Sequence, residues 1–218
     1  VDGVSLMNAD NQLQNLAAYV SNGSFALQNS QALQITQLIG TLGDAPLLTD
    51  GLDTEQGNGE QFVRSLGDSL LLEANLKAGT ALVSLESLGT IEQKGSGHGV
   101  VADDLKISAQ GDILLPSERN DVANLAADSA QGSLVYRDAD QLTIAQLSDT
   151  LGDRETLSGV NTSGADQEQY LTTVAGDLNL QQPLQAGHAL ISLESGGSVL
   201  QTDDAARISS AQLRVVAA

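Results

Sequence analysis

Cysteine and tryptophan are absent from this 218-residue chain, and aromatic residues make up only 2% of it. The lack of cysteine excludes disulfides and thiolate metal sites. Large compact cores usually contain many aromatic side chains, whereas a narrow core of Leu, Val, Ile and Ala needs few. Because 41% of the residues are nevertheless hydrophobic, we predict a thin aliphatic core.

Basic residues are also scarce, since nine Lys and Arg stand against 28 Asp and Glu and give a net charge of −19. Phosphate binding needs clustered Lys and Arg, so we expect neither nucleic acid nor an anionic membrane surface as a partner. No apolar run approaches the length of a membrane span, so we expect no membrane insertion. The opening VDGVSLMNAD lacks the basic start and apolar run of a signal peptide. An exported protein would therefore contain this chain as part of something longer.

One segment of ten residues occurs twice, as AGTALVSLES at 78–87 and as AGHALISLES at 186–195. The offset is 187 − 79 = 108, and shorter matches such as TLGD and NLAA continue it towards the N-terminus at 109. The chain is therefore two tandem copies of one unit, residues 1–109 and 110–218, with no linker between them. The single length change lies between APLLTD and RETLS, in a segment that we expect to be a loop. A fixed period of this kind is typical of repeat architectures.

Apolar and polar residues alternate in short runs such as HALISL and QLRVVA, which is typical of half-buried strands. Segments that open on glycine start 132 − 111 = 21 and 196 − 176 = 20 residues apart. A coil of this length holds short strands and bends, so a unit of 109 residues holds about five coils. We predict an all-β protein that forms a parallel β-helix, or β-solenoid. The alternative is an array of tandem β-sandwich domains, which the apolar junction KISAQGDILLP disfavours.

The aromatic residues are interpreted as core, because they exchange with other apolar residues between the two units. Phe25 aligns with Leu134, and Phe62 aligns with Tyr170. An aromatic residue that exchanges with Leu fills space rather than stacking on a ligand.

Catalytic groups show no concentrated pattern. Glycan-cleaving sites need clustered carboxylates, often with a neighbouring base. Only one basic position, Lys106 and its counterpart Arg214, is kept in both units, so we interpret the other bases as solvated surface. Neither His98 nor His188 has a repeated partner, and no GxSxG elbow is present. We expect the protein not to be an enzyme; the alternative is a lyase or hydrolase on a β-helix.

One acidic loop, TDGLDTEQGNGEQ, is a weak calcium candidate through Asp50, Asp53, Glu55 and Glu60. Oxygen ligands in a flexible loop suit Ca²⁺. The spacing is not that of an EF-hand, and the matching loop LSGVNTSGADQEQ retains fewer acids. We therefore favour a solvated acidic loop and predict no other metal or cofactor.

Several segments, GDLNLQQPLQAGHALISLESGGSVLQ, NDVANLAA and GSLVYRDADQLTIAQL among them, resemble the repeats of filamentous-haemagglutinin-like proteins, which are large bacterial surface adhesins and exoproteins. The resemblance covers essentially the whole chain, although the secretion domain of that family is absent from it. It implies a right-handed β-helix and an extracellular or bacterial cell-surface location. It also implies a structural or adhesive rod, with a host or surface glycan or protein as receptor.

The ends of the chain continue the repeat pattern. Val4 and Leu6 match the interior residues Ile113 and Leu115, and the closing QLRVVAA matches the interior DLKISAQ. Because natural solenoids cover their open edges, we predict that further copies of the unit stack on this chain, in cis or end to end, and that they assemble into a filament.

Overall fold

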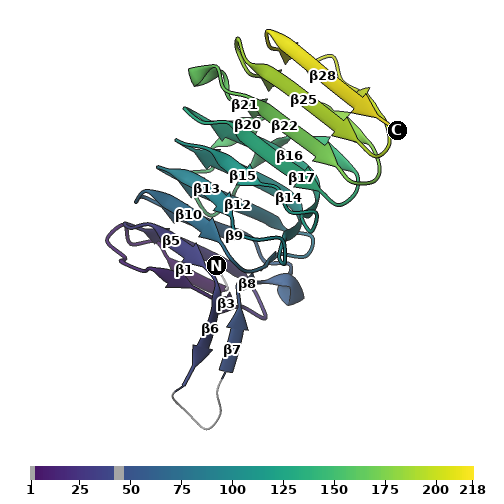
Figure 1. Ribbon diagram of the computed structural model, residues 1–218. Helices are drawn as coiled ribbons and strands as arrows, with labels where there is room; N and C mark the ends of the chain where they lie inside the picture. The colour runs from purple at the N-terminus through teal and green to yellow at the C-terminus, as the bar shows by residue number, and fades with distance from the viewer. Residues whose placement is uncertain (1–2, 42–46) are drawn as a thin grey trace.

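The computed structural model describes residues 3–41 and 47–218, most of which lie in short strands. The strands wind into a long solenoid that runs from the N-terminal turns to the C-terminal turns (Figure 1). The prediction of an all-β parallel β-helix is confirmed. The β-sandwich alternative is wrong, because its sheets are antiparallel and the described strands pair in parallel except in two hairpins.

Two broad sheets, named face A and face B here, each contain nine stacked strands and enclose the core. In stacking order, face A contains β1 (Gly3–Leu6), β4 (Ser24–Asn29), β9 (Gln61–Ser65), β12 (Leu82–Ser87), β14 (Val100–Ala109), β16 (Asp121–Ser129), β18 (Leu142–Ile144), β23 (Leu178–Leu180) and β26 (Val199–Gln201). Face B contains β2 (Asn15–Leu16), β5 (Leu33–Ile35), β10 (Ser69–Leu72), β13 (Thr90–Gln93), β15 (Ile113–Leu115), β17 (Leu134–Asp138), β22 (Gln169–Thr173), β25 (Leu190–Ser195) and β28 (Gln212–Ala217).

The remaining elements are short. Two-residue strands stack beside the faces and join β14 and β16, as β3 (Ala18–Tyr19), β8 (Leu52–Asp53), β11 (Leu76–Lys77), β21 (Val160–Asn161), β24 (Leu184–Gln185) and β27 (Ile208–Ser209). Single 3-10 turns, η1 (Glu55–Gly57) and η2 (Ser163–Ala165), occupy the same place in the two units. Two antiparallel hairpins leave the rod: β6 (Gln37–Gly40) with β7 (Leu47–Asp50), and β19 (Gln146–Ser148) with β20 (Thr156–Ser158).

Stacked aliphatic side chains form the core, as the composition predicted. Leu85 on β12 lies in register with Val63 on one side and Ile107 on the other, and all three are fully buried. Successive turns therefore place an apolar side chain on an apolar side chain along the rod. The predicted core aromatic Phe25 is buried among them. Because stacked aliphatic side chains fill most of the core, few aromatic residues are needed.

Each repeat unit occupies four and a half turns, close to the five that spacing predicted. The pairings β4–β9, β9–β12, β12–β14 and β14–β16 climb four turns on face A. The counterpart of β4 in the second unit is β17, half a turn further on, and β17 belongs to face B. The same exchange of faces holds for β9 and β22, and for β12 and β25. Consecutive units are thus turned so that their equivalent surfaces lie on opposite faces.

A buried glutamine hydrogen-bonds in the same way in both units. Gln61 Nε2 donates to Thr54 Oγ1 at 3.1 Å, and Gln169 Nε2 donates to Thr162 Oγ1 at 3.2 Å. Each of these side chains is fully buried. The duplicated sequence therefore repeats its internal polar contacts as well as its strands, and the β14–β16 pairing carries the ladder across the boundary at residue 109.

We expect Leu193→Asp to lower the free energy of unfolding by several kcal/mol, because it places an unpaired charge in the thin core. Leu193 is fully buried on β25, whereas the neighbouring Glu194 points outward with 43% of its side chain exposed. Glu194→Ala should change the unfolding free energy by less than about 0.5 kcal/mol. Urea denaturation of the two variants compares them, and a larger loss for Glu194→Ala would contradict the register.

Candidate functional site

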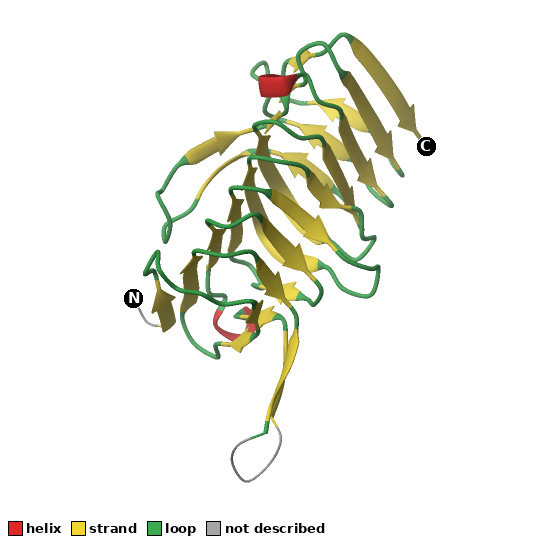
Figure 2. Ribbon diagram, turned by 60° about the vertical axis from the view of Figure 1, so that its left-hand side comes forward, coloured by secondary structure: helices red, strands yellow, loops and turns green. Residues whose placement is uncertain are grey.

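The hairpin β19–β20 folds back along the outer side of face A. It leaves the upper half of the rod and turns towards the N-terminal turns (Figure 2). Its strands pack against β14 and β16, and its tip reaches the start of β9, where Thr150 N donates to Oε1 of Glu60, the residue before the strand, at 2.8 Å. A hairpin of the second unit thus covers the outer face of the first unit.

The covered face contains side chains that alternate with the core residues and point away from the core. Phe62, Ser84, Lys106 and Ala126 lie on four consecutive strands of face A and are all buried. Gly152 in the hairpin packs directly against the Phe62 ring. A Cβ added at Gly152 would lie 2.2 Å from ring carbon Cε2, so only glycine fits there. The burial of Phe62 confirms that it is structural, but its place is this outer interface rather than the core.

Two bases form ion pairs beneath the hairpin. Lys106 Nζ lies 2.5 Å from Asp149 Oδ2, with both side chains buried, and 3.5 Å from Glu86 Oε1. Arg64 Nη2 lies 2.5 Å from both Glu86 Oε2 and Asp153 Oδ2. The interpretation of the unmatched bases as solvated surface is therefore wrong for Arg64, because its side chain is only 16% exposed and paired with two acids.

A shallow cleft of about 240 Å³ lies beside the hairpin tip, lined in part by Arg64, Glu86, Ser108, Asp153 and Glu155. The hydrogen bond from Arg64 lowers the pKa of Asp153, so this carboxyl stays ionised and paired. Glu86 is shared between two bases. The charged groups of the cleft thus serve the contact between hairpin and face.

A second cluster of carboxylates lies where the β17 end meets β16. Asp121, Asp138 and Asp140 place one oxygen each within 4.8 Å of one another. Asp138 is fully buried and accepts hydrogen bonds from the Tyr136 hydroxyl at 2.7 Å and from Val122 N at 3.2 Å. Burial raises the pKa of Asp138 to about 6. These bonds make Asp138 an organiser of the turn after β17.

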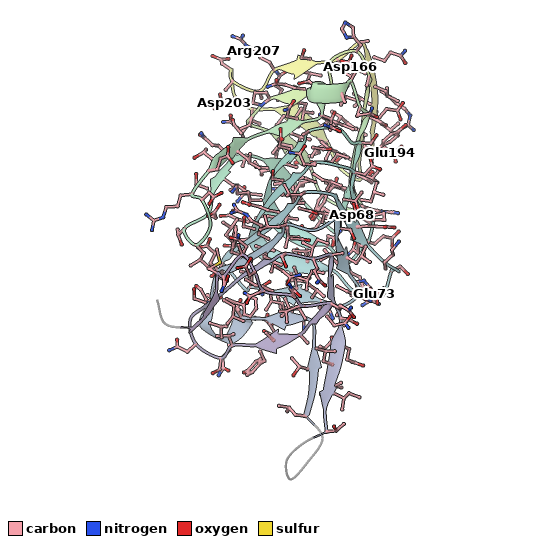
Figure 3. The ribbon with its side chains drawn as sticks, turned by 90° about the vertical axis from the view of Figure 1, so that its left-hand side faces the viewer. Asp68, Glu73, Asp166, Glu194, Asp203 and Arg207 are labelled. Atoms are coloured by element: carbon pink, nitrogen blue, oxygen red, sulfur yellow. The ribbon has the colours of Figure 1, made fainter. Side chains whose placement is uncertain are left out.

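The calcium candidates do not converge on one point. Asp50 accepts a hydrogen bond from Asn75, Asp53 from the backbone of Glu55, and Glu60 from Thr150. Within residues 3–41 and 47–218, the one group of three carboxylates close enough to share a cation excludes all four candidates. The acids are instead distributed along the rod, as the outward-pointing Asp68, Glu73, Asp166, Glu194 and Asp203 illustrate (Figure 3).

The two histidines lie in separate places. His98 Nε2 lies 2.9 Å from the carbonyl oxygen of Leu72. His188 is exposed, and its Nδ1 lies 3.2 Å from Asp166 Oδ1. Each therefore has a local contact of its own, and the fold does not bring the two together.

Sequence and structure comparisons return no relative. No protein family, curated protein or solved structure matches this chain. The resemblance to filamentous-haemagglutinin-like repeats thus stays a prediction that rests on the quoted segments. No helix in the described part of the chain has the length and apolar character needed to cross a membrane.

Sequence reasoning missed the interface between the hairpin and face A. The TLGD motif at Thr150–Asp153 is a repeated element of the sequence, but its partners Glu60 and Arg64 lie about 90 residues earlier, and the partner of the preceding Asp149 lies 43 residues earlier. The available signal was Lys106, the one base kept in both units, because a base at a position between core residues is unusual unless it has a buried partner.

We expect Lys106→Met to cost about 3 kcal/mol of unfolding free energy, because it leaves the Asp149 carboxylate buried without its partner. Combining it with Asp149→Asn should restore most of that loss, since the amide keeps the Oδ1 acceptor that binds Gly152 N at 2.7 Å. The matched control is Lys94→Met, at an exposed pair with Glu92, and it should change stability by less than about 1 kcal/mol. Chemical denaturation measures all three, and equal losses at Lys106 and Lys94 would contradict the buried pair.

The buried Asp138 predicts a specific pH dependence. Its pKa of about 6 lies above the ordinary 3.8, so the folded state binds the proton more tightly than the unfolded state does. Its contribution is most favourable below about pH 4 and falls as the pH rises through 6, by at most about 3 kcal/mol. Asp138→Asn should remove this fall, as urea unfolding of both proteins between pH 4 and pH 7 would reveal. An identical pH slope in the variant would show that Asp138 titrates normally.

Proposed function

We propose that this chain is a rod segment of a large repetitive extracellular or cell-surface protein, with a structural or adhesive role. The observation that carries the proposal is the unbroken strand ladder, which passes through both units and has an open edge at each end. Face A runs from β1 to β26 and face B from β2 to β28. An open edge of this kind pairs readily with another strand.

Apolar side chains at the β28 edge support stacking on a further turn. Leu213 and Val215 are 49% and 48% exposed. Their counterparts in the first unit, Leu105 and Ile107, are fully buried because β16 packs against them. A further turn at β28 would remove the same apolar surface from water, at about 25 cal/mol per Å².

The half-turn offset makes repeated stacking possible without a mismatch. Two units of four and a half turns bring the chain back to the same faces after nine turns. The pairing of Leu105 with Leu125 in the inner junction has its counterpart in Leu213 and the Leu16 of a following copy. Both residues belong to face B, so copies that stack end to end continue each face in register.

The surface role rests on the resemblance to filamentous-haemagglutinin-like repeats, and the receptor would be a host or surface glycan or protein. The net charge of −19 keeps such a rod soluble and repels anionic surfaces. The glycan-cleaving alternative stays a prediction, because the carboxylates of Glu86 and Asp153 in the cleft beside the hairpin are already paired with Arg64 and Lys106.

Proteins made of one, two and three fused copies test the rod. Joining Ala218 directly to Asp2 keeps the spacing that the inner junction has between its units. Nine strands per face at about 4.8 Å each predict that every added copy lengthens the particle by about 40 Å at constant width. Small-angle X-ray scattering gives both dimensions. Copies that fold side by side would widen the particle instead and would contradict the proposal.

A further inference from the structure

The two hairpins are the same element of the repeat, but only one of them has a surface beneath it. Leu147 in β19 is 8% exposed, whereas its counterpart Leu38 in β6 is 39% exposed. Ile39, Leu47 and Leu48 are 60%, 72% and 54% exposed. The β6–β7 hairpin projects from the N-terminal end of the rod (Figure 1) with these apolar side chains exposed, whereas Leu147 of the matching hairpin is covered.

The surface that should receive such a hairpin also exists a second time. Face A of the first unit offers Phe62 on β9, and its counterpart is Tyr170 on β22 of face B. Phe62 is fully buried by the hairpin, but Tyr170 is 37% exposed. Val216 on β28, the counterpart of Ser108, is 47% exposed. The equivalent outer surface in the second unit is thus exposed at β22 and β28, while Ser192 between them is buried and accepts a hydrogen bond from Arg214.

We propose that the β6–β7 hairpin binds the outer side of β22, β25 and β28 in a second copy of this repeat protein, stacked end to end. The inference rests on the proposed stacking and adds a clasp that fastens each joint from outside. The interface between β19–β20 and face A is its template, because both of its halves recur unpartnered in the described chain at the matching positions.

The geometry of the stacked rod brings these two halves together. Stacking continues face B of one copy into face B of the next, so the β6–β7 hairpin of the next copy leaves the rod above β28. Folding back as β19–β20 does, it descends over β28, β25 and β22. Thr41 would then meet Glu168, as Thr150 N meets Glu60 Oε1 at 2.8 Å. Each clasp therefore lies on the face opposite to the one before it.

The chemistry of this second clasp differs from that of its template. The buried pair of Lys106 and Asp149 has Arg214 and Gly40 as its counterparts, so the acid on the hairpin is missing. Arg214 is instead paired with Glu194 on its own face. The hairpin offers an apolar side chain there instead, because Leu47 pairs with Gly40 and so lies on the same side of the hairpin as Leu38. The joint between copies is thus mainly apolar, and we expect it to depend little on salt.

A fused pair of copies tests the clasp, because the chain has no cysteine of its own. Thr41→Cys is placed in the second copy and Glu168→Cys in the first, and a short bis-maleimide is added. Efficient internal cross-linking is expected, as in the positive control Glu60→Cys with Thr150→Cys inside one copy. The negative control combines Thr41→Cys in the second copy with Asp68→Cys in the first copy. Asp68 is an exposed residue of the first unit.

Leu38→Asp provides the matched pair of variants. In the second copy, where the hairpin is clasped, it should reduce cross-linking by about tenfold or more, since it places a charge in an apolar contact. In the first copy, where the hairpin is free, it should leave cross-linking unchanged. Cross-linking no better than that of the Asp68 control, or equal effects of the two substitutions, would overturn the clasp. Particle length in scattering reports stacking separately, so a rod that lengthens without cross-linking would leave the proposed rod standing and remove only the clasp.

Discussion

The parallel ladder is the constraint on which the rest of this structure depends. The backbone N–H and C=O groups of a strand form their hydrogen bonds with neighbouring strands, not within the strand itself. Each main strand takes its partners from the turns above and below, 19 to 22 residues away where no hairpin intervenes. The core follows from this pairing, since an inward Leu lies on the inward residue of the next turn. The same constraint leaves unpaired backbone groups at β26 and β28, and an unpaired edge favours the addition of a strand. Each further turn of a solenoid therefore adds its own stacking contacts to the stability of the rod.

The half-integral turn count adds a second level of organisation. Because a unit covers four and a half turns, its hairpin emerges on one face and the hairpin of the next unit on the other. In the proposed array of stacked copies, the hairpins would therefore secure successive joints from alternate sides. In the joint that the chain contains, Gly152 passes over Phe62 and Asp149 meets Lys106. Distant segments are fastened here by a hairpin, in addition to the strand ladder.

Charge is distributed in accordance with this architecture. Most acids point outward along the rod, where repulsion is screened by salt and water. Two of the bases have a different role, because Lys106 and Arg64 neutralise acids under the hairpin. Two acids of the described chain are buried: Asp149 pairs with Lys106, and Asp138 lies beside Tyr136 with a raised pKa. A very acidic protein can therefore still use a few buried ion pairs to position a hairpin that leaves its solenoid.

The repeat, the strand alternation and the core positions were readable from the sequence, because they depend on local periodicity. The near-identity of AGTALVSLES and AGHALISLES gave the unit, and the period-two alternation in HALISL indicated a half-buried strand. Spacing alone suggested about five coils and not the half turn, since the hairpin residues were counted within the period. Only the tertiary structure decided that Lys106 and Arg64 are covered, that Phe62 lies in an outer interface and that the Asp50 to Glu60 acids stay apart. The burial of Lys106, Arg64 and Phe62 depends on where a hairpin from the second unit comes to lie, through contacts between residues 43 to 90 positions apart, and such contacts leave no local pattern.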